Sequence, residues 1–414
     1  MKITIDEFRV FHELEQLGRI SEAPPPVTTR VVFTEADIQG REFVKGLCRD
    51  AGLAIREDSV GNTFARWAGA ESQTAPIGTG SHLDAIPNAG RYDGTVGVLG
   101  GIEALRALAR SGFRPRRPIE LVIFTSEEPT RFGIGCLGSR LLSGALDPVT
   151  AAQLKDRNGI SLDAARTHAG FAGALSSVRL SKGDYTAFVE LHIEQGPLLE
   201  MRDVEIGVVT AIAAPATVRI WIEGEGGHAG AVLMPDRRDA FLGAAEIALA
   251  IESSARSTGA IDTVATVGVC ELFPGAVNSI PSRVRIEADV RDIDEARRNS
   301  VLRQIEETCN KVGVRRGLNI RTEPLNADPP AKCASQVVDA VTRACQTHGL
   351  NHMQMISRAY HDSLFMSRIA PTGMIFIPSQ LGYSHRPEEY SSPQAIGKGA
   401  LVLAETLAGL AGAA

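Results

Sequence analysis

Continuously apolar runs alternate with helical patterns in the first half of the chain. Residues 77–81, 119–125 (IELVIFT) and 188–192 are short apolar stretches. Such runs are typical of strands that are buried on both faces of a parallel sheet. Apolar segments rich in small residues, at 96–111 and from 137 onward, predict helices between these strands. This half of the sequence therefore predicts an α/β fold.

The middle of the chain follows a different pattern. Residues 216–223 (ATVRIWIE) and 284–290 (VRIEADV) alternate apolar with polar positions. Strict alternation is typical of antiparallel strands that expose one face to water. Helical periodicity covers roughly 236–254 and 295–312. We therefore expect an inserted α+β domain with an antiparallel sheet.

A chain of 414 residues is longer than one ordinary core supports, which also favours two domains. We assign residues 1–211 and 327–414 to a catalytic domain with a mostly parallel central sheet flanked by helices. Residues 212–326 form the inserted domain. These boundaries follow the change of pattern and the Pro329-Pro330 pair, after which the chain returns to the first domain.

Charge and composition exclude several classes of partner. The formal net charge is -6 and the arginines are scattered, whereas a nucleic-acid-binding protein shows a basic face. The N-terminus has helical spacing without an apolar signal-peptide core, and the apolar stretch 399–414 is too short to span a membrane. Six cysteines without a CxxC pair predict reduced thiols. We expect a cytoplasmic enzyme that binds neither nucleic acid nor a membrane.

Polar side chains follow three of the predicted strands at the point where each strand ends. His82 and Asp84 follow the first, Glu127 and Glu128 the second, and His192 ends the third. Ligands bind at the carboxyl ends of strands in open α/β sheets. Taken singly, each feature has an ordinary structural explanation. The HxD pair is a hydrogen-bonded pair, the two glutamates lie in a solvated loop, and a lone histidine is structural.

Together these residues predict a metal centre. Asp84 is placed to orient His82, because a metal-binding histidine usually has its second nitrogen held by a carboxylate or carbonyl. Imidazole and carboxylate ligands without thiolates suit Zn²⁺ or Mn²⁺. Five ligands for two ions require one to bridge, and an aspartate does so readily. Glu127, beside a ligand, is placed to act as general base. The candidate ligands are His82, Asp93, Glu128, His192 and His385.

At this point the sequence resembles the peptidase-M20-like amidohydrolases, and within them the hydantoinase/carbamoylase group. The motifs HLDAIPNAGRYDG, SEEPTRFG, LHIEQG, GGHAG and GYSH occur in the order of that group, from about residue 42 to the C-terminus. The resemblance implies the five ligands above with Asp93 bridging, and Glu127 as base. It also implies two divalent ions per subunit, Mn²⁺ ahead of Zn²⁺, Ni²⁺ or Co²⁺, and a homodimer formed through the inserted domain, which also acts as a lid.

The same resemblance implies substrate-binding residues in the inserted domain. His228 of GEGGHAGAV is expected to reach the partner subunit's site and stabilise an oxyanion, although its simpler explanation is a surface-loop histidine. Asn278 and Arg291 match positions that hold a substrate carboxylate, and an arginine fork suits that role. The alternative for Arg291 is a salt bridge to Asp289 or Asp292.

Further segments, among them GMIFIPSQLGYSHRPEEYSSP and RAYHD, resemble the ureidoglycolate amidohydrolases, which release glyoxylate, ammonia and CO2 in purine and allantoin breakdown. We hypothesise that Tyr360 and His361 contact a small anionic ureido substrate, and that Gln195 holds its ureido group. The alternatives are an allantoate amidohydrolase or an N-carbamoyl-L-amino-acid hydrolase, and more distantly a dipeptidase, an aminoacylase or a non-catalytic ureide-binding protein. The GxGxxG match at 133–138 does not follow its strand directly, which argues against a dinucleotide site.

Overall fold

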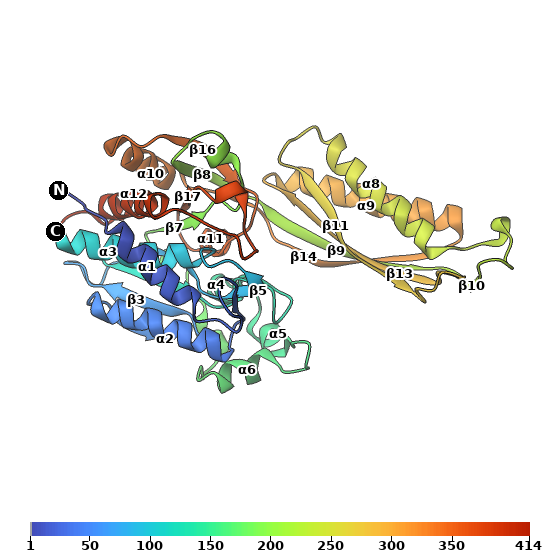
Figure 1. Cartoon of the computed structure of the whole chain (residues 1–414), viewed down its shortest axis with the longest axis horizontal. Coiled ribbons are helices and arrows are strands. Elements are labelled where there is room, and N and C mark those ends of the chain that lie inside the picture. The colour runs from blue at the N-terminus through green and yellow to red at the C-terminus, as the bar shows by residue number, and fades with distance from the viewer. Residues whose placement is uncertain (1) are drawn as a thin grey trace. The chain divides into compact units, whose positions relative to one another are not determined.

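The computed structural model describes residues 2–414, which form two compact units (Figure 1). Unit 1 contains the described residues up to Thr210, together with Cys333–Ser357 and His361–Ala414. Unit 2 contains Ala211–Lys332 and the short segment Arg358–Tyr360. The sequence predicts breaks at 211/212 and 326/327 and leaves residues 358–360 in the catalytic domain.

A nine-stranded mixed sheet, eight strands of which lie wholly or mostly in unit 1, forms the centre of that unit. Its strands are β2 (Ala54–Glu57), β3 (Thr63–Trp67), β4 (Ile77–His82), β6 (Ile119–Phe124), β7 (Ala187–Ile193), β8 (Ile206–Ile212), β15 (Ala331–Lys332), β16 (His352–Ser357) and β17 (Thr372–Ile377). Their order is β15-β8-β17-β7-β4-β6-β3-β2, and β16 also pairs with β8. The four central strands β17, β7, β4 and β6 are parallel. The loops after these four strands therefore leave the same edge of the sheet.

Helices cover both faces of this sheet. One face carries α1 (Glu7–Gly18), α2 (Glu35–Asp50), α3 (Thr95–Arg110), α10 (Ser335–Thr347) and α12 (Pro393–Ala411), and α1, α3 and α12 lie side by side (Figure 1). The other carries α4 (Leu137–Ser143), α5 (Pro148–Gln153), α6 (Leu162–His168) and α11 (Asp362–Met366). A separate hydrophobic core lies on each face of the sheet. Successive side chains of β6 point to opposite faces, so Leu121 and Ile123 pack in the first core and Val122 and Phe124 pack in the second.

Shorter elements complete unit 1. β1 (Thr28–Arg30) pairs with β5 (Ala85–Ala89) in a separate two-stranded sheet directly after β4. The helix α7 (Leu198–Met201) and the 3₁₀ turns η1 (Leu175–Val178) and η3 (Gln380–Gly382) lie in loops. No helix among residues 2–414 has both the length and the apolarity needed to cross a membrane.

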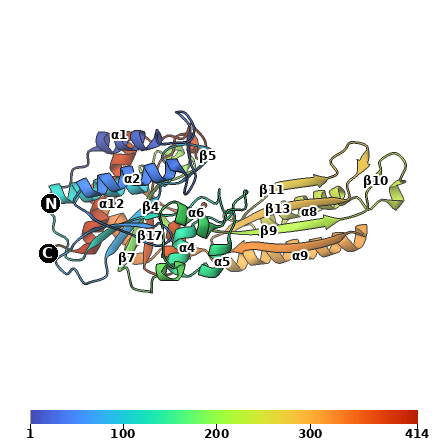
Figure 2. The ribbon, with the colours of Figure 1, turned by 90° about the horizontal axis from the view of Figure 1, so that it is seen from below.

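Unit 2 is a four-stranded antiparallel sheet with two helices on one face (Figure 2). The order is β11-β13-β9-β14, from Val264–Phe273, Arg283–Asp292, Ala214–Glu223 and Asn319–Ala327. The helices are α8 (Ala240–Ser257) and α9 (Glu295–Arg316), and β10 (Gly227–His228) pairs with β12 (Ser279–Ile280). Val218, Ile220 and Ile222 of β9 face the helices, as the alternation predicts.

The predicted fold class is confirmed in both units, with a mixed α/β sheet in one and an antiparallel sheet in the other. The expected helix from residue 236 begins later, at Ala240. The turn η2 (Met234–Asp236) precedes it, and the side chain of Asp239 accepts hydrogen bonds from the main-chain N–H groups of Phe241 and Leu242. This cap satisfies N–H groups that the first helical turn leaves free, and so sets where the helix starts.

Candidate metal centre

His82, the last residue of β4, is held by the residue two positions further on. Its Nδ1 lies 2.9 Å from the main-chain carbonyl oxygen of Asp84, which leaves Nε2 as the ligand atom. The Asp84 carboxylate lies 3.8 Å from Nδ1, so the main-chain oxygen of Asp84 is the atom that holds His82. The carboxylate instead accepts the main-chain N–H groups of Glu127 and Glu128, at 3.2 and 3.0 Å. Asp84 thus orients the two glutamates with its carboxylate and His82 with its carbonyl.

Asp93 lies at the centre of the cluster. Its Oδ1 is 3.5 Å from His82 Nε2 and 3.2 Å from His192 Nε2. Its Oδ2 is 3.2 Å from His385 Nε2, which in turn is 3.3 Å from Glu128 Oε1. His192 ends the apolar part of β7, is fully buried, and has its Nδ1 held by the carbonyl of Ile193 at 2.9 Å.

The five predicted ligands therefore come together as two groups that share Asp93. One group is His82, Asp93 and His192, and the other is Asp93, Glu128 and His385. Within each group the ligand atoms lie within 4.8 Å of one another. This arrangement fits two cations joined by one aspartate. The donors are imidazoles and carboxylates, which suit Zn²⁺, Mn²⁺, Ni²⁺ or Co²⁺.

The clustered charges shift the pKa values of these groups in opposite directions. Burial alone would lower the pKa of His82, but the carboxylates of Glu127 and Asp93 raise it well above its ordinary value. Burial alone would raise the pKa of Asp93, but hydrogen bonds from three imidazoles hold it well below its usual range. Hydrogen bonds, first to Asp93, raise the pKa of His385 to about 11. The carboxylates thus stabilise positive charge at the centre of the cluster, as a cation site requires.

Glu127 belongs to neither ligand group but lies beside both. Its Oε2 is 3.8 Å from His82 Nε2, and its Oε1 lies 3.5 Å from the thiol of Cys136. Burial raises the pKa of Glu127 well above its ordinary value, and neighbouring carboxylates add to the shift. A carboxylate with a raised pKa holds a proton more readily, which suits a group that must accept and return one. Cys136 was not selected from the sequence, because its contact with Glu127 depends on the folded loop.

Three polar residues surround Asp93, and only one was selected from the sequence. Gln195 donates from Nε2 to Asp93 Oδ2 at 2.6 Å, and its buried Oε1 has no hydrogen-bond partner among the described residues. Ser384 Oγ lies 2.8 Å from the same Oδ2. Glu389 Oε1 accepts the main-chain N–H of Asp93 at 3.1 Å. Ser384 and Glu389 lie in the GYSHRPEEYSS segment that carries His385, but a polar run does not indicate which of its members turn inward.

His361 is buried directly behind His192. The two rings have centroids 4.4 Å apart, and His361 Nε2 lies 3.0 Å from Ser357 Oγ. The third group of possible ligands consists of Glu190, His192 and His361. Both Glu190 oxygens, however, already accept hydrogen bonds, from the hydroxyls of Ser81 at 2.7 Å and Ser363 at 2.6 Å. Glu190 is therefore already engaged in hydrogen bonds, and His361 packs against the ring of His192.

The remaining predicted residues belong to unit 2. His228 is exposed on β10, and its Nδ1 accepts the main-chain N–H of Gly230 at 3.1 Å. The carbonyl of Asn278 accepts the N–H of Ala229 at 2.9 Å, so Asn278 lies beside His228. Arg291 pairs with Asp289 at 2.7 Å, which is one of the two salt bridges considered as an alternative.

Arg291 also makes a second contact within unit 2. Its Nη1 donates to the carbonyl of Arg358 at 3.3 Å, two residues before Tyr360. Asp292, the other possible partner of Arg291, pairs with Arg297 instead. The structure thus groups Arg291 with the Tyr360 segment, and it groups the five ligands with Glu127, Gln195 and His361 in unit 1.

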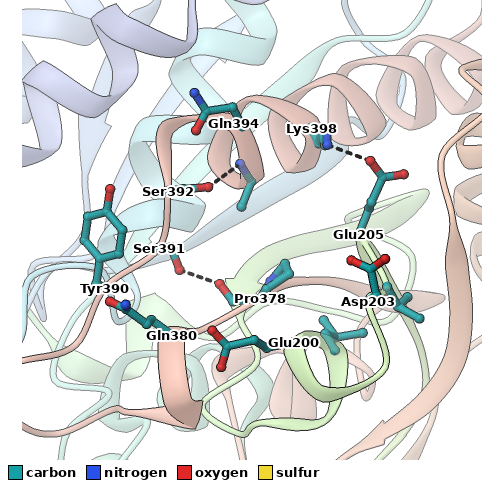
Figure 3. A pocket seen from close by; sticks show the side chains of 13 residues that line it. Glu200, Asp203, Glu205, Pro378, Gln380, Tyr390, Ser391, Ser392, Gln394 and Lys398 are labelled. Atoms are coloured by element: carbon teal, nitrogen blue, oxygen red, sulfur yellow. Dashed lines mark hydrogen bonds and ion pairs between the residues drawn. The ribbon is translucent and has the colours of Figure 1, made fainter.

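A cavity of about 360 Å³ also lies in unit 1, between α7, η3 and the first turn of α12 (Figure 3). Its lining includes the acidic residues Glu200, Asp203 and Glu205, and the side chains of two of them have partners. Glu205 pairs with Lys398 at 2.6 Å, and Glu200 accepts the N–H of Leu381 at 2.6 Å. None of the five predicted metal ligands lines this cavity. This cavity is therefore separate from the candidate metal ligands around Asp93.

Comparison with known proteins agrees with this geometry. The family model of peptidase family M20/M25/M40 matches residues 78–409, a range that holds every predicted ligand. The chain belongs to this family. Its members are generally metal-dependent hydrolases, which accords with the ligand groups around Asp93.

Among family members, the chain is similar to ureidoglycolate hydrolase of Arabidopsis thaliana, with 52% identity across 99% of this chain and 87% of the relative. The N-carbamoyl-L-amino acid amidohydrolase of Geobacillus stearothermophilus is 38% identical across 96% of this chain and 97% of its own. The solved structure of AtUAH in complex with (S)-hydroxyglycine superposes with a TM-score of 0.91 at 52% identity, and covers 99% of this chain and 98% of that one. These matches identify an amidohydrolase of the M20 family.

Proposed function

We propose that this protein hydrolyses a linear ureido C–N bond with two divalent ions, and that its substrate is ureidoglycolate. One observation carries the reaction type: two ligand groups share Asp93, and the carboxylate of Glu127 adjoins them without belonging to either. That arrangement is what metal-assisted hydrolysis needs, since one set of groups binds ions and a separate base handles the proton of water.

The residues that would hold the ions are the five described above, with Asp93 common to both. Two bound ions would lower the pKa of a shared water toward about 7 and polarise the substrate carbonyl. We expect Mn²⁺, and the donor set equally accepts Zn²⁺, Ni²⁺ or Co²⁺.

Glu127 would move the proton. Its Oε2 faces His82, whereas Oε1 faces Cys136, so Oε2 is the atom that takes the proton of the attacking water. The same oxygen then returns the proton to the departing nitrogen. The raised pKa of Glu127 supports the first of these two steps, in which the carboxylate takes the proton of water.

Gln195 would recognise the ureido group. Its Oε1 is a buried acceptor without a partner among the described residues, and a ureido nitrogen offers the N–H that such an acceptor requires. Arg291 would bind the substrate carboxylate through its guanidinium, with Tyr360 on the segment beside it. The salt bridge to Asp289 keeps the Arg291 guanidinium oriented, and the strands hold both residues.

Asn278 and His228 cannot meet Arg291 of the same chain on a small substrate. In β13, Arg291 pairs with Pro215 and Arg283 with Glu223, and β10 follows the Glu223 end of β9. The eight residue steps from Arg283 to Arg291 span roughly 26 Å at the usual rise of a strand. We therefore propose that His228 and Asn278 act in the site of a partner subunit, where His228 donates to the oxyanion and Asn278 helps to hold the carboxylate.

A homodimer through unit 2 would supply that partner. Within the described residues β11 is an edge strand, paired only with β13. Phe241 and Leu249 of α8 are exposed, and with Val267 of β11 they line an apolar groove of about 460 Å³. An unpaired edge beside an apolar helix face is suited to a second copy, because the two edges extend one sheet and the two helices bury each other's apolar side chains.

Similarity to known relatives supports ureidoglycolate as the substrate. Identity to the ureidoglycolate hydrolase exceeds that to the N-carbamoyl-L-amino acid enzyme, at 52% against 38%. Hydrolytic loss of the carbamoyl group of ureidoglycolate as ammonia and CO2 would leave hydroxyglycine, the compound bound in the AtUAH structure. Hydroxyglycine then loses a second ammonia to give glyoxylate.

The test is ammonia release from Mn²⁺-loaded protein with ureidoglycolate, allantoate and an N-carbamoyl-L-amino acid run side by side. We expect kcat/KM to be highest for ureidoglycolate. A preference for either other compound would be consistent with the proposed metal site but would show that ureidoglycolate is not the substrate. No release from any of the three, with both ions bound, would reject the proposed function as a whole.

A further inference from the structure

Glu389 is a buried carboxylate at the metal centre that the proposed mechanism does not use. It lies four residues after His385, in the loop between β17 and α12, and is 3% exposed. Its Oε1 accepts the main-chain N–H groups of Tyr92 at 2.7 Å and Asp93 at 3.1 Å. Its Oε2 is 3.0 Å from Ser384 Oγ, and that hydroxyl is 2.8 Å from Asp93 Oδ2. Glu389 therefore holds Asp93 through its main chain, and the Ser384 hydroxyl, which has one proton to donate, lies between the two carboxyl groups.

These contacts join two loops from opposite ends of the sequence. Asp93 lies just before α3, and Ser384 and His385 follow β17. Asp93 is common to both ligand groups, so a rotation of its carboxylate would misplace a ligand for both ions at once. A residue that fixes the two loops relative to each other thus fixes the shape of both sites.

The loop before Asp93 is packed directly on Glu389. A Cβ atom at Gly90 would lie 2.5 Å from Glu389 Oε1, so the absence of a side chain at Gly90 gives the carboxylate its space. Nearby cations pair elsewhere: Arg386 binds Glu388 at 2.8 Å and Arg91 binds Glu15 at 2.5 Å. The contacts of Glu389 are thus directed at the loop that carries Asp93 and at Ser384.

We propose that Glu389 is a positioning residue that holds Asp93, through two main-chain N–H groups and the Ser384 hydroxyl, in the orientation that bridges two ions. The inference rests on the proposed two-ion function. It assigns Glu389 no contact with substrate. It predicts that loss of this carboxylate weakens metal binding before it affects the global fold.

The test compares Mn²⁺ binding to wild type, Glu389→Ala, Glu389→Gln and Glu388→Ala, by equilibrium dialysis with metal analysis. Glu388 is the matched control, because it neighbours Glu389, is exposed and pairs with Arg386. Loss of a residue that orients metal ligands typically lowers metal affinity ~10–100-fold. We expect a loss of that size in Glu389→Ala. The amide of Glu389→Gln keeps an acceptor for both N–H groups, so near-normal binding is expected there and in Glu388→Ala.

Two-ion binding by Glu389→Ala with wild-type affinity would overturn the inference. Absence of Mn²⁺ binding by the wild type would instead overturn the proposed function, so the two failures are distinguishable. Circular dichroism of the metal-free variants reports the fold. If Glu389→Ala does not fold, Ser384→Ala removes the hydroxyl that contacts Asp93, Glu389 and Gln195 and leaves the main-chain contacts of Glu389 in place. In that variant, a fall in Mn²⁺ affinity supports the inference and unchanged affinity rejects it.

Discussion

The imidazole of His82 fills the space that a side chain at Gly94 would need. A Cβ atom at Gly94 would overlap the ring of His82, and Gly94 also has φ 66° and ψ -47°, which disfavour other residues. The backbone turn into α3 and the position of a proposed metal ligand therefore depend on one glycine. Asp93, the proposed shared ligand, is the residue directly before it.

Gly94→Ala should lower both metal affinity and stability. The strained backbone is expected to cost roughly 1–3 kcal/mol, and displacement of His82 should weaken Mn²⁺ binding about 10-fold or more. Gly112→Ala is the matched control, since Gly112 has φ 79° and a Cβ atom there would have no neighbour within 4 Å. It should lose stability but bind Mn²⁺ normally. Calorimetric metal titration and thermal unfolding of both variants check this, and equal metal affinities would contradict it.

Glu127→Gln should retain both ions and the fold while losing turnover. The amide keeps the shape of the side chain but cannot take the proton of water, and loss of a general base typically lowers the rate ~10²–10⁴-fold. Ammonia release, together with the Mn²⁺ content of the same sample, measures the effect. Substantial activity in a fully loaded variant would remove Glu127 as the base.

Removal of metal should abolish activity and lower the melting temperature. Each bound ion stabilises the native state by about 2.7 kcal/mol at a free concentration 100-fold above its Kd. Chelation followed by Mn²⁺ addition should therefore restore both the melting temperature and activity.

Substitutions of the ligands should then separate the two sites. Asp93→Asn should bind neither ion well because Asp93 belongs to both groups, whereas His82→Ala should retain the ion held by Glu128 and His385. Equal Mn²⁺ stoichiometry in these two variants would argue against a shared ligand.

Inactive subunits should complement each other. Glu127→Gln and His228→Ala lie in different units, and we place His228 in the partner's site. Subunits mixed by co-refolding should form about half heterodimers, each with one intact site of two, which gives about one quarter of wild-type activity. If His228 acts within its own chain, the mixture stays as inactive as its parents.

The apolar groove of unit 2 should hold the dimer together. Leu249→Glu on α8 places a charge on this groove and should shift the sedimentation coefficient to that of a monomer, with loss of activity. Val314→Glu on α9 is the control, since Val314 is exposed and does not line the groove. A dimer that survives Leu249→Glu would move the interface elsewhere.

The sequence predicts the ligands that follow buried strands because the end of each continuous apolar run marks the end of a strand. His82, Glu128 and His192 follow apolar runs, and parallel strands bring such ends to one edge of the sheet. His385 has no comparable signal, since its loop is irregular and its own φ is 59°. It was identified through the family motif.

What the sequence does not predict is which atom of a residue acts. Asp84 was expected to orient His82 through either a carboxylate or a carbonyl oxygen. The main-chain carbonyl does so, and the carboxylate orients the two glutamates. For a related reason, the sequence does not predict site roles for Cys136, Ser384 and Glu389. Their contacts join loops distant in sequence, and residue type alone carries no information on such pairings.

The position of β17 affects how the protein is made. This strand, Thr372–Ile377, lies between β8 and β7, although both neighbours end at or before Ile212 and so leave the ribosome about 160 residues earlier. Until β17 emerges, the nascent chain holds two open strand edges at the centre of its main sheet, a state prone to aggregation. Productive assembly must therefore wait for nearly the whole polypeptide, and demand for chaperones should be greatest late in translation.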